Sequence, residues 1–228
     1  MKNQNGFTIL ELLIATTVVS VILLLVSIMS ISIGNLFHKG IYQSRVQENV
    51  RKLTDEIAVE IKNTSVTPVN TLPSASGGLI HRLCIGDTQY TYIIGYQLGD
   101  NASQSKHVLW KDKLSGSCNQ PGASDLSIDP PSTGGTDGVE LLSAGMRLTS
   151  FTVGSASTPS AYSISIGVAF GDDDLLCSPS SASTTCALPN TSISMPERSN
   201  DDLTCKESSG SSFCSRASLR TLVVQRVH

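Results

Sequence analysis

The sequence predicts an α+β protein in which one long N-terminal helix packs on an antiparallel β-sheet. Three observations lead to this prediction. An uncharged apolar run over Leu12–Ile33 passes, without a proline, into an amphipathic stretch that reaches Asn63. The remaining chain is rich in Ser, Thr and Gly and contains alternating segments typical of strands. All six cysteines follow the apolar run, which favours disulfide-bonded loops.

The apolar run is long enough to cross a membrane. Its 22 residues, from Leu12 to Ile33, would span about 33 Å as a helix, close to one hydrocarbon core. A secretory signal peptide has a shorter apolar stretch that ends in a small-residue cleavage site, and no such site follows here. Glu11 stands at the front of the run, where a carboxylate costs on the order of 2.5–3.5 kcal/mol. We therefore expect Glu11 to have a functional partner.

The helix continues beyond the apolar run as an amphipathic stretch. Its apolar positions recur at spacings of four, three, four and four residues: Val46, Val50, Leu53, Ile57 and Ile61. These spacings form one helical stripe. Opposite charges four residues apart, Glu48 with Lys52 and Arg51 with Asp55, are expected to pair on the outer face. We predict one continuous helix over residues 7–63.

The N-terminal residues Gly6-Phe7-Thr8-Ile9-Leu10-Glu11 resemble the processing site of type IV pilins and type II secretion pseudopilins. The resemblance covers the leader, the glycine, the aromatic residue, the glutamate and the two-part helix. It implies that a prepilin peptidase removes the leader, which contains Lys2, by cutting after Gly6 on the cytoplasmic side. It also implies that Phe7 becomes the N-methylated N-terminus.

The same resemblance gives Glu11 a partner. When the apolar helices pack in a filament core, the carboxylate would face the terminal ammonium of a neighbouring subunit. Buried opposite charges are tolerated only as a pair, so this contact would set the register between subunits. The alternative is a carboxylate that stays in the lipid headgroup layer.

The resemblance also divides the chain into four parts with the pilin fold. These are a leader over residues 1–6, a transmembrane and filament-core helix over 7–33, an amphipathic helix half over 34–63, and a β-rich head over 64–228.

The chain after the helix predicts a connecting loop and then strands. Residues 64–78 contain two prolines and a glycine pair, which is typical of a loop. Two β-rich segments, 78–85 and 89–97, flank Gly86-Asp87-Thr88 and predict a hairpin. Further strands are expected at 106–111, 148–153, 161–170 and 217–227, a short helix or strand at 139–147, and surface loops at 112–137 and 171–213.

The cysteines are predicted to form disulfides in an oxidising space outside the membrane. They are Cys84, Cys118, Cys177, Cys186, Cys205 and Cys214. Sequence proximity favours joining Cys177 to Cys186 and Cys205 to Cys214, because short loops close at the least entropic cost. The remaining two would then pair, although other pairings and free buried thiols stay open. No CxxC motif indicates zinc or a redox site.

The sequence contains no motif that predicts an enzyme or a cofactor. GxSxG, HExxH and P-loop patterns are absent, and the four histidines are scattered. Asp172, Asp173 and Asp174 are calcium candidates because oxygen-rich loops hold this ion, although such a run is more typical of a solvated turn.

Charge argues against nucleic acid as a partner. The net charge is −3, whereas affinity for nucleic acid rests mostly on neutralising phosphates. The basic cluster is confined to Arg216, Arg220, Arg226 and His228 near the C-terminus.

Taken as a whole, the resemblance implies a structural subunit, a minor pilin of a type IV pilus. The protein would be a single-pass inner-membrane protein with its C-terminal domain outside, and later part of a cell-surface pilus. Its implied partners are other pilin subunits through the N-terminal helix, the prepilin peptidase, the inner-membrane assembly platform, and membrane lipid before assembly. The disulfide-rich loop and the terminal strand that bears Arg220 resemble minor pilins that prime assembly or lie near the tip.

Several alternatives stay open. Within the family, the chain could be a type II secretion pseudopilin or a major pilin, or a DNA-binding or adhesive tip subunit. Glu11 argues against the family's tip subunit that lacks this residue. Outside the family, the alternative is an anchored enzyme or adhesin.

Overall fold

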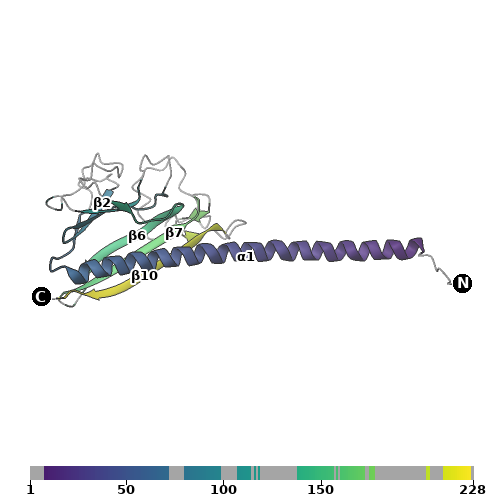
Figure 1. Ribbon diagram of the computed structural model, residues 1–228, viewed down its shortest axis with the longest axis horizontal. Coiled ribbons are helices and arrows are strands. Elements are labelled where there is room, and N and C mark those ends of the chain that lie inside the picture. The colour runs from purple at the N-terminus through teal and green to yellow at the C-terminus, as the bar shows by residue number, and fades with distance from the viewer. Residues whose placement is uncertain are drawn as a thin grey trace.

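The structure is a computed structural model in which one long helix carries a β-rich head at its C-terminal half (Figure 1). It describes residues 8–71, 80–98, 107–113, 116, 118, 138–156, 158, 160–172, 175–177, 204–205 and 213–226.

Helix α1 (Ile9–Asn63) has 55 residues and is about 80 Å long. Thr8 caps its N-terminus, and the extended Thr64 ends it, with the Thr64 N–H donating to the Glu60 carbonyl oxygen. Only the second half has a buried face: Val46, Val50, Leu53, Thr54, Ile57, Ala58 and Ile61. This set contains the apolar stripe predicted from the spacing, so the predicted amphipathic helix is confirmed.

A five-stranded antiparallel sheet covers one side of the buried helix face. Its strands follow the chain order: β1 (Val69–Thr71), β2 (Ile80–Ile85), β3 (Thr88–Ile93), β4 (Leu109–Lys113) and β5 (Val139–Glu140). The predicted hairpin joins β2 and β3. Gly86 in its turn has φ +61°, and a Cβ there would lie 2.9 Å from the Thr64 hydroxyl, so only glycine fits this approach to the helix end.

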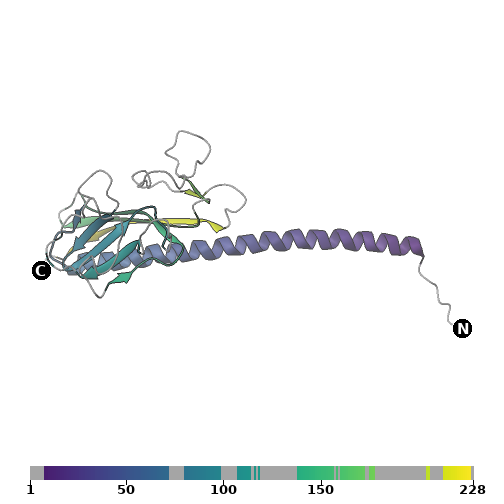
Figure 2. The same cartoon turned by 90° about the horizontal axis from the view of Figure 1, so that it is seen from above.

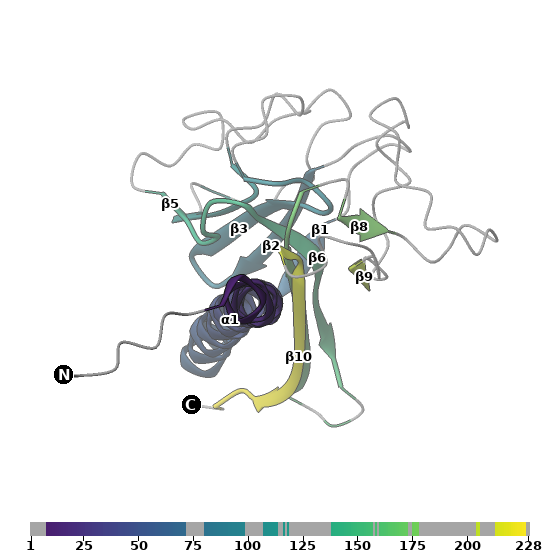
Figure 3. The ribbon, with the colours of Figure 1, turned by 90° about the vertical axis from the view of Figure 1, so that its right-hand side faces the viewer.

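A second, three-stranded antiparallel sheet has the order β10-β7-β6. It consists of β6 (Met146–Ser155), β7 (Ala161–Phe170) and β10 (Ser215–Val224). Seen along the helix, α1 lies in the angle between the two sheets, with β3 on one side and β10 on the other (Figure 3). A two-stranded ribbon consists of β8 (Leu176–Cys177) and β9 (Thr204–Cys205).

The core fills the angle between the helix and the sheets. Tyr92 and Phe151, one from each sheet, meet edge to face with ring centroids 4.6 Å apart, an arrangement that aromatic pairs favour. Lys111 on β4 donates to Glu56 at 2.8 Å and to Glu60 at 3.1 Å, which fastens the first sheet to α1. Burial opposes the charge on Lys111, but the two carboxylates outweigh it and raise the pKa of the ammonium.

Buried Arg147 links the two sheets. It lies on β6, donates to the carbonyl oxygens of Gly95 and Gly171, and forms an isolated bridge with Gln97. Carbonyl oxygens from two separate segments thus stabilise the buried guanidinium group. These hydrogen bonds connect β6 to the segment after β3 and to the segment after β7.

Some predicted boundaries were wrong. The expected loop 64–78 contains β1, and the expected loop 171–213 contains β8 and β9. The expected strand 106–111 starts later, at Leu109, and the closing strand ends at Val224 rather than 227. The short strands exist only because a distant segment pairs with them: β1 with β2, and β8 with β9. Local sequence carries no signal for such pairing.

The segment 139–147 is neither one helix nor one strand. Glu140 explains the break, because its carboxylate accepts hydrogen bonds from the backbone N–H groups of Val108, Leu109 and Leu142. These bonds turn the chain after β5, and a new strand begins at Met146. Burial raises the pKa of this carboxyl group, against the opposing effect of its N–H donors.

Candidate functional site

The first turn of α1 holds a capping box between Thr8 and Glu11. The Thr8 hydroxyl accepts a hydrogen bond from the Glu11 N–H at 3.2 Å, and Glu11 Oε2 accepts from the Thr8 N–H and hydroxyl, each at 2.9 Å. The box supplies acceptors to backbone N–H groups that the first turn of a helix leaves without a hydrogen bond. It also places a negative charge at the positive end of the helix dipole. The Thr-x-x-Glu spacing, which the sequence-based prediction overlooked, signals this box.

Glu11 keeps one oxygen available. Both of its bonds end on Oε2, and Oε1 accepts no hydrogen bond from any described residue. A carboxylate oxygen can accept more than one hydrogen bond. Glu11 can therefore keep its own helix capped while it binds a second, cationic group.

The first half of α1 lies outside the head and has no partner within the described chain. Every side chain from Ile9 to Ile33 is exposed, and the segment projects freely (Figure 2). By length and composition, α1 is the one described helix that could cross a membrane. Its surface is apolar on all sides, which suits lipid or a helix bundle rather than water.

The polar side chains of this segment are satisfied within the helix. Six hydroxyl groups donate to carbonyl oxygens three or four residues earlier: Thr16, Thr17, Ser20, Ser27, Ser30 and Ser32. A free hydroxyl donor would oppose burial in an apolar medium. The segment can therefore enter lipid or a packed core without leaving these donors unpaired.

The predicted processing residues lie outside the described part of the chain. This holds for Gly6 and Phe7, and so for the expected leader. Two of the calcium candidates, Asp173 and Asp174, are also outside it. The third, Asp172, has an oxygen 3.5 Å from the Gln97 amide nitrogen. The described residues contain no group of three or more His, Cys, Asp or Glu placed to share a metal ion.

Among the described residues of the head, two disulfides are present. One joins Cys84 on β2 to Cys118, and the other joins Cys205 on β9 to Cys214 just before β10. Sequence proximity favoured Cys205–Cys214, and Cys84–Cys118 is the pair that was left over. The remaining expected pair includes Cys186, which lies outside the described residues.

The predicted basic cluster is spread along β10. Arg216 and Arg220 lie on the same face of the strand, four residues apart, and Arg220 Nε donates to the Ser163 hydroxyl at 3.1 Å. One arginine thus packs along its own sheet, and the case for nucleic acid gains no further support.

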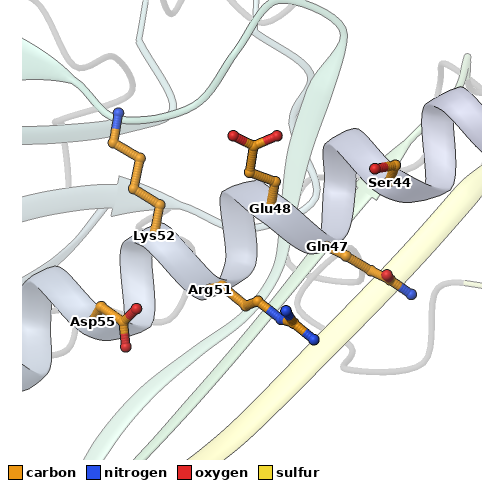
Figure 4. A pocket seen from close by; sticks show the side chains of 6 residues that line it. All are labelled: Ser44, Gln47, Glu48, Arg51, Lys52 and Asp55. Carbon is orange, nitrogen blue, oxygen red and sulfur yellow. The ribbon is translucent and has the colours of Figure 1, made fainter.

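The outer face of the amphipathic half forms a shallow open pocket of mixed charge (Figure 4). Its lining residues all come from α1: Ser44, Gln47, Glu48, Arg51, Lys52 and Asp55. The expected ion pairs were wrong, because neither Glu48 with Lys52 nor Arg51 with Asp55 comes within 4.0 Å in this described segment. Solvated side chains without fixed partners do not make a binding site.

Comparison with known proteins finds a match at the N-terminal residues of the chain. A family model, the prokaryotic N-terminal methylation motif, matches residues 1–27. No curated protein and no solved structure matches the chain. The matched motif spans the capping box and most of the exposed apolar segment, and an α+β head follows on the same helix. The motif, together with one long apolar helix that carries an α+β head, supports a relationship of this chain to type IV pilins and pseudopilins.

Proposed function

We propose that this protein is a minor pilin of a type IV pilus. Residues 7–33 hold it in the inner membrane with the head outside, the prepilin peptidase cuts after Gly6, and Phe7 is N-methylated. The mature subunit then enters the filament through α1, with the assembly platform of the inner membrane as a further partner.

The observation that carries this proposal is the division of one helix into two surfaces. From Val46 onward one face of α1 is buried under the head, whereas from Ile9 to Ile33 every side chain is exposed and most are apolar. A monomer in water would not keep such a surface uncovered. Lipid covers it before assembly, and neighbouring helices cover it in a filament.

Glu11 provides the specific contact in the proposed filament. Cleavage after Gly6 places a cationic amine on Phe7, one turn before Glu11. The helix stagger of a filament core brings the amine of one subunit to the free Oε1 of another. The capping bonds on Oε2 persist, so the carboxylate serves its own helix and its neighbour together. A buried charge left without this partner would cost about 3–5 kcal/mol.

The minor role, near the tip or in priming, rests on the disulfides of the head and on the long polar segments that the sequence predicts to be surface loops, at 112–137 and 171–213. A pseudopilin or a major pilin has the same helix, so the helix does not separate these roles.

A deletion strain tests the role. Pili are counted by electron microscopy in the wild type, in the deletion strain, and in the deletion strain that re-expresses the chain. Loss of nearly all pili, restored by re-expression, indicates priming. Pili of normal number that lack only an adhesive or uptake function indicate a tip subunit. Unchanged pili with a loss of protein secretion would contradict the proposal and favour a pseudopilin.

A further inference from the structure

The head and α1 meet in a group of aromatic rings that the assembly contact does not use. We call this group the neck cluster. Its members are Phe37, His38 and Tyr42 on α1, Phe170 at the end of β7, and Phe213 just before β10.

The neck cluster joins the head to the helix where the helix leaves it. The Tyr42 ring stacks on Phe170 with centroids 4.5 Å apart and planes within 14°. The Phe213 ring lies 5.8 Å from the His38 ring and 6.3 Å from the Tyr42 ring. The cluster thus sets the lower edge of the head at the level of residues 38–42.

Rigid backbone supports the two rings of the head. Phe213 precedes Cys214, which is disulfide-bonded to Cys205. Phe170 packs over Gly145, which has φ +77°, and a Cβ at that position would lie 2.8 Å from the ring. Even so, the cluster is open to solvent, because Phe213 is 43% exposed and Phe37 is 66% exposed. Two large apolar rings, Phe213 beside the disulfide and Phe37 on α1, are therefore exposed to solvent.

The position of the neck cluster along α1, measured from the end of the apolar run, indicates which medium covers it. The uncharged apolar run ends at Ile33, so Phe37 lies about 6 Å beyond it along the helix and Tyr42 about 13 Å beyond it. The headgroup region adds about 5–8 Å to each side of the hydrocarbon core. Aromatic rings concentrate in this region, because it accepts apolar surface and polar groups together. Lys39 lies at the same level and can meet lipid phosphates.

We propose that, before assembly, the membrane-proximal rings of the neck cluster, Phe37, His38 and Phe213, reach the phospholipid headgroup layer, with Tyr42 and Phe170 just beyond it, and hold the head against the membrane surface. The cluster is continuous with the apolar surface of α1, so the medium that surrounds the helix also reaches these rings. This inference rests on the membrane-anchoring part of the proposed function. Assembly would then have to lift the rings out of the lipid as the subunit leaves the membrane.

Tryptophan reporters in the full-length chain test the inference. The chain has one tryptophan, Trp110, so all variants carry Trp110→Phe to leave a single reporter. Phe213→Trp reports the neck cluster. Leu222→Trp is the matched control, because Leu222 is 69% exposed and lies on β10, nine residues after Phe213 and about 30 Å further along an extended chain. Ile22→Trp reports the membrane segment. Each variant is reconstituted in phosphatidylcholine vesicles without a quencher, with brominated acyl chains, or with a nitroxide on the lipid headgroup.

We expect the Ile22→Trp fluorescence to be strongly quenched by brominated lipid. The headgroup nitroxide should quench the Phe213→Trp fluorescence several times more than that of Leu222→Trp, and the Phe213→Trp emission should shift to the blue on reconstitution. If Ile22→Trp is quenched and Phe213→Trp behaves like Leu222→Trp, the inference is overturned while the membrane anchor stands. A blue shift of Phe213→Trp that appears only at high protein density, without quenching, would assign the cluster to a second copy. If Ile22→Trp itself is not quenched, anchoring and the inference fail together.

Discussion

Glu11 and Thr8 form hydrogen bonds with each other within a single chain, without a second subunit. Their capping box gives the carboxylate two hydrogen bonds on Oε2 at the exposed start of α1. The box lowers the free-energy cost of placing a carboxylate beside an apolar segment, because the N-terminus of a helix favours negative charge. In the monomer, a local partner therefore holds Glu11, and the proposed contact between subunits uses the other oxygen.

Substitution of Glu11 separates these two roles. Glu11→Gln keeps a side chain that can complete a capping box but removes the charge. We expect Glu11→Gln to insert in the membrane at wild-type level and to be strongly reduced in sheared pili, as measured by immunoblot of both fractions. Thr8→Ala is the matched control, because it breaks the box and keeps the carboxylate. Its incorporation should be closer to that of the wild type. Equal incorporation of Glu11→Gln and wild type would rule out the charge pair.

His81 predicts how stability depends on pH. It stacks on Tyr92 with ring centroids 5.1 Å apart, and burial lowers the pKa of its imidazole below the ordinary value. A lowered pKa means that the folded state disfavours the charged ring. Its stabilising contribution is therefore complete above the ordinary pKa of 6.5 and is lost as the pH falls through the lower folded-state value.

Urea unfolding in detergent at pH 7.5 and 5.5 measures this effect. The wild type should lose more unfolding free energy between the two pH values than His81→Phe, which keeps a ring on Tyr92 but cannot titrate. Equal losses in the two proteins would show that His81 is not the titrating group.

At this scale the sequence predicts the residues that short motifs define. Glu11 follows from the charge pattern, and Thr8 could have been found from its spacing to Glu11. The neck cluster could not. Tyr42 and Phe170 lie far apart in the chain, and nothing in either segment indicates that the end of β7 reaches the helix at that height.

Among the elements, α1 is the best predicted because its pattern is long and continuous. Its second half is stabilised by the stripe that faces the sheets. Ile57 is fully buried there, whereas Val59, two residues on, is 53% exposed. The same helix thus offers a core position and a matched surface position.

Truncation of this stripe should weaken the head. Ile57→Ala is expected to lower the free energy of unfolding by about 2–5 kcal/mol, because it leaves a cavity between α1 and the sheets. Val59→Ala should change it by less than about 0.5 kcal/mol. Urea titrations of the full chain in detergent, followed by Trp110 fluorescence, measure both. Similar effects at the two positions would contradict the packing of α1 described above.

The strands were predicted where alternation is strong, as in β7, and missed where they are short. β1, β8 and β9 have two or three residues each, too few for a pattern. They are defined by pairing with distant segments. The break between β5 and β6 depends on Glu140, whose three backbone partners lie partly in another strand. Such contacts depend on the whole fold and leave no local signal.

The molecule as a whole combines a helix surface that avoids water with a polar head that needs it. The second half of α1 packs in the core of the head and its first half is the apolar surface, so the head follows the apolar half. In the membrane, that half places the head at the surface. In a filament, the same half would lie in the core, with the heads outside. One chain would therefore lie first in the membrane and later in the filament, and its leader would be removed between these two stages.

The N-terminus of the protein in purified pili shows whether the chain is both processed and assembled. Pili are sheared from the cells, and the N-terminal peptide of this chain is identified by mass spectrometry in the pilus and membrane fractions. The account predicts a pilus-associated chain that begins at N-methylated Phe7, as a minor component beside a more abundant subunit. A chain that retains residues 1–6 and is found only in the membrane fraction would contradict it.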